Sequence, residues 1–277
     1  MKILLRNFIN LLSIGVFETE DTVELMSEYK WNKLLYIAKV NNVQDFINTG
    51  IAKTEVANPS LIPQNISHAI TVEACRPFET NKANDGYSDF SISRKAKKFS
   101  CFYFNHQYEK LVSAEIHNID TSVESLLLLN KLLGNINSLL NSGLDLRLLA
   151  DLGTYLRNYG DKIDFVKIDN WIKLLNIKKM ASLIGVCLIQ IFHFEKEELP
   201  FIKYESKKYT RNIASAFEKN LTVQANSAPD INEDNGNSIN PISRPNTHPL
   251  KYFSYYPLEA TSRFISNIIK SLSNIDE

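Results

Sequence analysis

Residues 121–158 read TSVESLLLLNKLLGNINSLLNSGLDLRLLADLGTYLRN, and this stretch decides the fold class. Its leucines recur every three or four positions, which is the spacing that gathers apolar side chains on one side of an α-helix. Thr121 and Glu124 form the pattern of a capping box at the start of a helix over 121–142, in which both side chains bind free N–H groups of the first turn. Gly143 marks the end of that helix, since glycine is common just past a helix C-terminus.

Helical signals continue along the chain in both directions. Asp145 is suited to cap a helix over 146–158 that ends at Gly160, and either Asp164 or Asp169 opens the next helix. Together these signals predict an all-α fold, a multi-helix domain of orthogonal or bundle-like architecture. Further helices are predicted over 2–17, 29–48, 88–117, 178–193, 205–219 and 257–272.

The segment near the C-terminal end differs from the rest in composition. It is rich in asparagine and proline and poor in large apolar residues, so burial cannot offset the entropy cost of ordering it, and we expect a long disordered loop. The predicted organisation is an N-terminal helical pair over 1–51, an irregular connector over 52–90, a main helical domain over 91–219, the flexible loop over 220–249, and a C-terminal helix over 250–277 that packs back on the core.

The composition is that of an ordinary globular chain without excess charge. Of its 277 residues, 31 are Lys or Arg and 31 are Asp or Glu, so the net charge is zero. A neutral chain has no overall electrostatic attraction to nucleic acid or to anionic membranes. We therefore expect a soluble protein whose partner is another protein, and not a membrane or nucleic acid.

The cysteines and the N-terminal segment indicate the compartment. Cys75, Cys101 and Cys187 are far apart and odd in number, which is a poor disulfide framework and favours the reducing cytoplasm. Cys187 falls in an apolar helix, where we expect an inert core thiol. Residues 2–17 show helical spacing without a cleavage site, so they predict an amphipathic core helix rather than a secretory signal. The chain also lacks an apolar run long enough for a transmembrane helix.

Familiar catalytic and metal-binding patterns are missing from the sequence. His106, Glu109 and His117 share one side of a predicted helix, but the two histidines are about 16 Å apart along it, too far for one zinc ion. The chain has no G-x-S-x-G elbow and no glycine-rich phosphate loop. We therefore expect no catalytic residue, no metal and no cofactor.

The densest basic patch lies in the predicted helix over 88–117. Cations interleaved with aromatic residues can follow a nucleic-acid backbone, and a solvated helix face explains the same residues. The neutral net charge favours the solvated face. The patch consists of Arg94, Lys95, Lys97 and Lys98, with Phe90 and Phe99 nearby.

Arg147 and Asp151 are the most informative charged residues. They are four positions apart on a predicted helix, so their side chains can pair. Leucines surround both, and we interpret them as a partly buried ion pair that fixes helix packing. The alternative is that Arg147 binds an anionic ligand.

This segment resembles the C-terminal helical part of an uncharacterised bacterial nucleotidyltransferase-like family. Members show a glycine, then a Leu-Arg pair, then an Asp four residues after the Arg, and Gly143, Leu146, Arg147 and Asp151 match that pattern. The resemblance covers about 200 residues at the two ends of the chain and implies an all-helical relative. Its other parts are KIDF at 162–165 with Trp171, EELP at 197–200, LLSIGVF at 11–17 and the segment from Trp31 to Val43.

The middle of the chain departs from that family. Members carry a catalytic domain with a Gly-Ser or Gly-Gly turn and an Asp-x-Asp pair that holds Mg²⁺, and this sequence contains none of these. The resemblance therefore transfers no catalytic residue to this chain.

Three functions follow as hypotheses. The favoured one is a non-enzymatic helical protein-interaction module, whose partner is another protein, related to the helical part of the family. The second is a divergent nucleotidyltransferase with carboxylates from Glu115, Asp120 and Glu124, which is the activity expected if the chain is an enzyme. The third is a nucleic-acid-binding helical protein that uses the basic patch.

Overall fold

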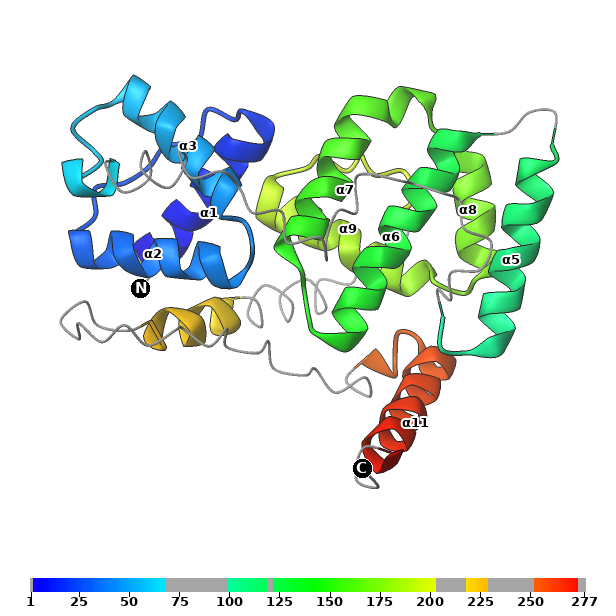
Figure 1. Ribbon diagram of the computed structural model, residues 1–277. Helices are drawn as coiled ribbons and strands as arrows, with labels where there is room; N and C mark the ends of the chain where they lie inside the picture. The colour runs from blue at the N-terminus through cyan, green and yellow to red at the C-terminus, as the bar shows by residue number, and fades with distance from the viewer. Residues whose placement is uncertain (1, 68–98, 119–121, 203–217, 229–251, 274–277) are drawn as a thin grey trace. The chain divides into compact units, whose positions relative to one another are not determined.

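The computed structural model describes residues 2–67, 99–118, 122–202, 218–228 and 252–273, and helices without any strand make up its regular structure there (Figure 1). The expected all-α fold class is confirmed. The described helices belong to two compact units. Unit 1 contains α1 (Lys2–Phe17), α2 (Glu28–Val40), α3 (Gln44–Ala57) and a helix over 218–226. Unit 2 contains α5 (Phe102–Ile116), α6 (Val123–Asn141), α7 (Leu146–Tyr159), the 3₁₀ turn η1 (Gly160–Lys162), α8 (Phe165–Leu174), α9 (Lys178–Phe192) and α11 (Pro257–Ser273).

Glycines bring α1 and α3 into backbone contact in unit 1. A Cβ atom on Gly50 would lie 2.1 Å from the carbonyl oxygen of Leu11, and a Cβ atom on Gly15 would lie 1.9 Å from the carbonyl oxygen of Phe46. Real Cβ atoms do not approach backbone so closely. The packing of α1 on α3 therefore requires residues without side chains at both positions.

A buried asparagine of α1 holds the link between α1 and α2, residues 18–27, against α1. Asn7 is fully buried, its Nδ2 donates to the carbonyl oxygen of Glu24 at 2.7 Å, and its Oδ1 accepts from the N–H of Glu24 at 3.0 Å. The side chain thus replaces the partners that a strand would have offered. Val23 and Met26 are buried on either side of this contact.

The predicted single helix over 29–48 is wrong, because the structure has two helices there. α2 ends at Val40 and α3 begins at Gln44. Asn42 between them has a φ of 56°, in the left-handed region that asparagine tolerates better than most residues. The predicted boundary at residue 51 consequently falls inside α3.

Part of the predicted loop over 220–249 is also helical. Leu221 and Ala225 are buried, and Gln224 between them accepts a 2.8 Å hydrogen bond from Nδ2 of Asn41, the C-cap residue of α2. The two buried side chains and the hydrogen bond lie on one side of this short helix. The polar composition of the segment gave no sign of them. Residues 229–249, and residues 205–217 of the helix predicted before them, lie outside the described part of the chain.

α6 is the central helix of unit 2, and α7, α8 and α9 pack around it. The buried leucines of α6 share one broad side of the helix, as the spacing in the 121–158 stretch predicted. The helix begins at Val123 with Ser122 as its N-cap, one residue later than the predicted capping box, whose Thr121 lies outside the described residues. Within those residues, no helix has the length and apolar character needed to cross a membrane.

Two predicted N-caps of unit 2 are confirmed. Asp145 accepts hydrogen bonds from the N–H groups of Arg147 and Leu148 at the start of α7. Asp164, rather than Asp169, does the same at the start of α8. These carboxylates satisfy donors that have no partner inside a helix.

Candidate functional site

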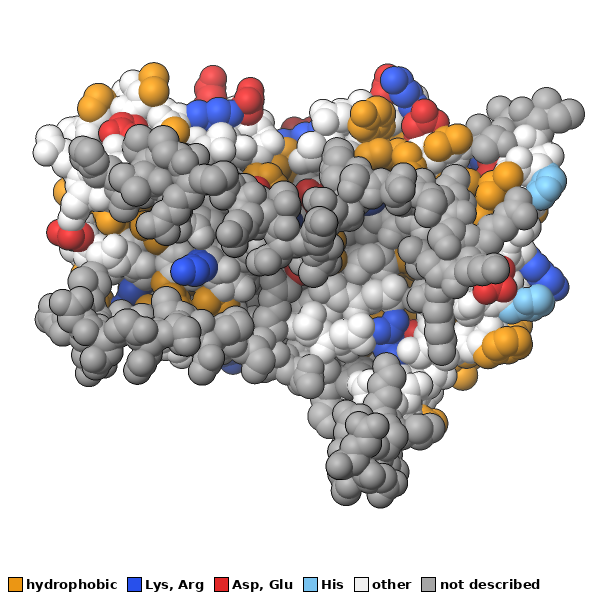
Figure 2. All heavy atoms as spheres, in the orientation of Figure 1, with side chains coloured by type: hydrophobic (Ala, Val, Ile, Leu, Met, Phe, Trp, Pro, Cys, Tyr) orange, Lys and Arg blue, Asp and Glu red, His pale blue; other side chains and the backbone are white. Residues whose placement is uncertain are grey.

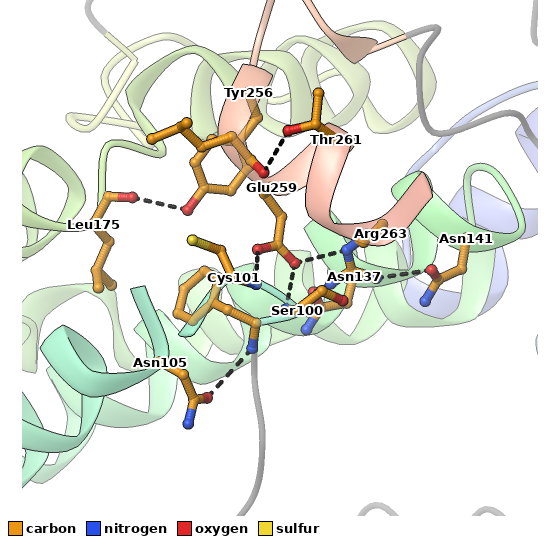
Figure 3. A network of polar contacts seen from close by, with 12 residues as sticks. Ser100, Cys101, Asn105, Asn137, Asn141, Leu175, Tyr256, Glu259, Thr261 and Arg263 are labelled. Carbon is orange, nitrogen blue, oxygen red and sulfur yellow. Dashed lines mark hydrogen bonds and ion pairs between the residues drawn. The ribbon is translucent and has the colours of Figure 1, made fainter. Parts of the chain in front are cut away.

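A buried polar network joins α11 to the helices of unit 2 (Figure 3). Its centre is Glu259, whose side chain has no exposed surface. The carboxylate accepts from Ser100 N at 2.7 Å, from Cys101 N at 2.9 Å and from Arg263 Nε at 2.8 Å. A charge buried to this extent is stable only with partners of this kind.

The carboxylate of Glu259 serves as a cap for α5. Cys101 is the N-cap residue of that helix but offers no side-chain hydrogen bond, and the first turn contains no acidic residue. The N-terminus of a helix carries a partial positive charge, which a carboxylate neutralises. α5 therefore receives its cap from a residue that is 158 positions away from Cys101 along the chain.

Arg263 extends the network to the end of α6. Its side chain is 8% exposed; Nη1 donates to Asn141 Oδ1 at 2.7 Å, and Nη2 donates to Asn137 Oδ1. One ion pair on α11 thus connects two other helices. This geometry fixes the position of the first turns of α11.

Tyr256 completes the attachment just before α11 begins. Its ring is fully buried 5.1 Å from the ring of Phe104, and its hydroxyl donates to the carbonyl oxygen of Leu175 at 2.9 Å. Desolvation, followed by the nearby Glu259 carboxylate, raises the pKa of the Tyr256 phenol above its usual value. The hydroxyl therefore stays protonated and remains a donor.

The network has a structural role rather than a chemical one. Glu259 and Arg263 are buried, and each is bonded to groups of the chain itself. General acid–base catalysis needs a group within hydrogen-bond reach of a substrate atom. The network instead holds α5 and α11 in fixed positions. A binding function would therefore depend on the side chains that these helices expose.

The start of α5 exposes two aromatic side chains. Phe102 is 84% exposed and Tyr103 is 56% exposed. They come directly after Cys101, whose backbone N–H donates to the buried carboxylate of Glu259. His106, one turn further on, stacks on Phe102 with its ring centroid 6.2 Å away. Figure 2 shows hydrophobic and histidine side chains along the outer side of α5. We call Phe102 and Tyr103 the α5 aromatic pair.

Arg147 and Asp151 both lie on α7 and are half-buried. Each makes a polar or electrostatic interaction. Their pairing with one another stays a prediction. The basic patch of Arg94, Lys95, Lys97 and Lys98 lies outside the described residues.

A double-mutant cycle tests the predicted Arg147–Asp151 pair. Arg147→Ala should lower the free energy of unfolding by about 3 kcal/mol, because it leaves a partly buried carboxylate without its partner. Replacing both residues with apolar ones should cost clearly less. Chemical denaturation of the wild type, Arg147→Ala, Asp151→Ala and the double variant measures the coupling, and a value near zero would leave Arg147 as a candidate ligand-binding residue.

Glu115, one of the carboxylates considered for a divergent transferase, has a structural role. It is buried on α5, where Oε1 accepts from Lys167 Nζ at 2.8 Å and from Ser122 N at 3.0 Å. Asp120 lies outside the described residues, and within those residues no three His, Cys, Asp or Glu side chains are placed to hold a metal ion. His117 is also engaged, with Nδ1 2.6 Å from the carbonyl oxygen of Ser113.

The transferase hypothesis has a direct test. We expect Mg²⁺ with any nucleoside triphosphate to leave the melting temperature unchanged, because Glu115 is already bound by a lysine and a backbone N–H. A ligand at a hundred times its Kd would stabilise the fold by about 2.7 kcal/mol. A thermal melt with and without Mg-NTP would detect a shift of that size, and such a shift would restore the hypothesis.

Cys187 has the predicted character of an inert core thiol. It is buried in α9, and desolvation raises its pKa from 9.0 to about 12. The neutral thiol is favoured in the folded state, so this contribution to stability is present below pH 9 and is lost as the pH rises toward 12. We expect Cys187 to stay unmodified by a thiol reagent at pH 8 until the protein unfolds, as peptide mass spectrometry would show. Labelling as fast as that of the half-exposed Cys101 would contradict this burial.

Glu259 and Arg263 are the important residues that the sequence analysis missed. A signal for them exists, since they are four positions apart in the amphipathic C-terminal helix and lie together on its polar side. The usual rule assigns the polar side of such a helix to solvent. Here the polar side is the buried one, and the pair was overlooked for that reason.

No known protein family, curated protein or solved structure matches this chain.

Proposed function

We propose that this chain is a non-enzymatic, cytoplasmic protein-interaction module that binds its partner through the α5 aromatic pair. The observation that carries the proposal is the exposure of Phe102 and Tyr103 on a helix end that is held in place by buried contacts. Contiguous exposed apolar surface is typical of interaction sites, and Phe102 and Tyr103 are neighbours in the chain. The free thiols of Cys101 and Cys187 are consistent with a reducing compartment.

The start of α5 is preorganised for binding. Aromatic residues dominate the binding energy of protein interfaces. Association costs less when the contacting backbone is already fixed, and the Glu259 carboxylate fixes the backbone directly before Phe102. The stacking of His106 on Phe102 also limits the freedom of that ring.

The chemistry of the expected partner follows from the same side of α5. Phe102, His106 and Lys110 are each four residues apart and all exposed, so they follow one another along the helix. We propose a partner protein with an apolar pocket for the aromatic pair and an acidic rim that faces Lys110. The resemblance to the helical regions of the nucleotidyltransferase-like family supports a helical module without a transferase core.

The test begins with affinity capture by the full chain in cells of its source. The wild type should capture one protein that the variant Phe102→Ser, Tyr103→Ser does not. Val166→Ser is the matched control, because Val166 is 73% exposed on α8 of the same unit. With both partners purified, loss of the aromatic pair should weaken binding by about 30-fold or more, the effect of a hot spot of 2 kcal/mol.

Two results would overturn the proposal. One is a captured protein that binds the wild type and the aromatic variant with equal affinity after purification. The other is the failure of any captured protein to bind as a purified pair. Circular dichroism melting should show both variants folded, since all three substituted side chains are exposed.

A further inference from the structure

α11 and the residues just before it are attached to unit 2 by a small set of buried side chains. Within residues 252–267 four side chains are buried: Tyr256, Glu259, Ala260 and Arg263. Two of the four are charged, and their hydrogen bonds can be exchanged for bonds to water when the helix detaches. A segment with few buried apolar contacts opens at a lower free energy than a core helix. We therefore expect α11 to detach locally more often than the central helices of unit 2.

The start of α5 depends on this attachment (Figure 3). The Glu259 carboxylate accepts from Cys101 N at 2.9 Å, directly before the α5 aromatic pair. The ring of Tyr256 lies 5.1 Å from that of Phe104, which in turn lies 5.5 Å from the ring of Tyr103. Contacts from the C-terminal segment thus reach the aromatic pair from both sides in the chain.

The second half of α5 is held by other helices. The Tyr108 hydroxyl donates to Asn130 Oδ1 of α6 at 2.5 Å, and Glu115 Oε1 accepts from Lys167 Nζ of α8 at 2.8 Å. Tyr108 and Glu115 are buried, and neither contact involves α11. Detachment of α11 would therefore leave the second half of α5 in place and release its first turn.

We propose that α11 is a latch for the α5 aromatic pair. When α11 is docked, the first turn of α5 is formed and the pair is fixed; when α11 detaches, that turn opens with it. The inference rests on the proposed function, since it assigns the regulation of the same binding surface. Because coupling between two sites is reciprocal, any factor that favours detachment of α11 weakens binding at the pair, and a bound partner holds α11 in its docked position.

Amide hydrogen exchange of the full chain, followed residue by residue by NMR, tests the latch without a partner. Exchange of a protected amide reports the free energy of local opening. Tyr256→Phe removes the hydroxyl that donates to the carbonyl oxygen of Leu175, and it keeps the ring that contacts Phe104. The amides of Ser100 and Cys101 should then exchange about fivefold faster or more, the effect of losing one buried hydrogen bond, and the amides within α11 should accelerate by the same factor.

Two further variants make the measurement specific. Tyr155→Phe is the matched control, because the Tyr155 hydroxyl donates to the carbonyl oxygen of Glu124 at 3.0 Å in the same unit, and it should leave the start of α5 and α11 at wild-type rates. Asn141→Ala removes an exposed acceptor of Arg263 on α6 and should accelerate the same amides as Tyr256→Phe. The amides of residues 109–116 should keep their wild-type rates in all three variants.

The outcomes separate the latch from the proposed function. Unchanged exchange at Ser100 and Cys101 in both Tyr256→Phe and Asn141→Ala would overturn the latch, whether or not α11 itself exchanges faster. Equal acceleration along the whole of α5 would also overturn it, because the second half has anchors of its own. The exchange measurement needs no partner, so a failed partner capture would count against the proposed function alone.

Discussion

Replacing Glu259 with alanine will lower the free energy of unfolding of unit 2 by about 3–5 kcal/mol, the usual cost of breaking a buried ion pair from one side. The change leaves the guanidinium of Arg263 buried without its carboxylate, and it leaves Ser100 N and Cys101 N at the start of α5 without an acceptor. Single domains have a total stability of about 5–15 kcal/mol. The loss is therefore a large fraction of what holds the unit folded.

Urea denaturation followed at Trp171 measures this effect. The chain has two tryptophans, Trp31 in unit 1 and Trp171 in unit 2, so a Trp31→Phe background reports on unit 2 alone. Glu197→Ala, at an exposed position of the same unit, is the matched control and should change stability by no more than about 0.5 kcal/mol. Changing Glu259 and Arg263 together to methionine should cost less than Glu259→Ala, because no orphan charge remains. Equal midpoints for Glu259→Ala and Glu197→Ala would refute the structural role of the network.

Gly50→Ala will destabilise unit 1 by about 3 kcal/mol, the upper end of the usual cost of overpacking. The added methyl would lie 2.1 Å from the carbonyl oxygen of Leu11 and 3.0 Å from its carbonyl carbon. Both atoms belong to backbone, so no side-chain rotation can relieve the contact. α1 and α3 must move apart, which opens a core that is packed to crystal-like density.

Gly134→Ala is the control with the opposite sign. Gly134 lies within α6, and a Cβ atom there would meet nothing within 4 Å. The substitution should stabilise unit 2 by about 0.5–1 kcal/mol through the helix preference of alanine.

Trp31 fluorescence in a Trp171→Phe background measures the loss caused by Gly50→Ala. Similar stabilities of Gly50→Ala and wild type would show that α1 and α3 do not cross in backbone contact.

Separate measurement of the two units matters because their unfolding need not be one transition. Stability values from a single curve apply only to a two-state system. The helix over 218–226 belongs to unit 1, whereas α11, which follows it in the chain, belongs to unit 2. The chain thus returns to the first unit before it completes the second.

Local sequence was sufficient to predict those helices whose apolar pattern and caps come from their own residues. Apolar periodicity together with a carboxylate at the first position predicted α7 and its cap at Asp145, and a continuous apolar run predicted α9. These signals act between neighbours in the chain, so they are visible without the fold. The break between α2 and α3 was missed because an asparagine in the left-handed conformation interrupts the backbone without interrupting the apolar pattern.

The amino-acid sequence by itself determined the all-α class, the leucine-rich helix α6 and the Asp145 cap of α7. Only the tertiary structure decided which side of α11 is buried, since Glu259 and Arg263 find their partners on α5 and α6, more than 100 positions away in the chain. A polar side chain is stable in a core when its hydrogen bonds are met there. Those partners are assembled only when the helices pack, so the pattern of α11 taken alone predicts the opposite orientation. The exposure of Phe102 and Tyr103 follows from the same packing, because the buried carboxylate of Glu259 holds the backbone directly before them.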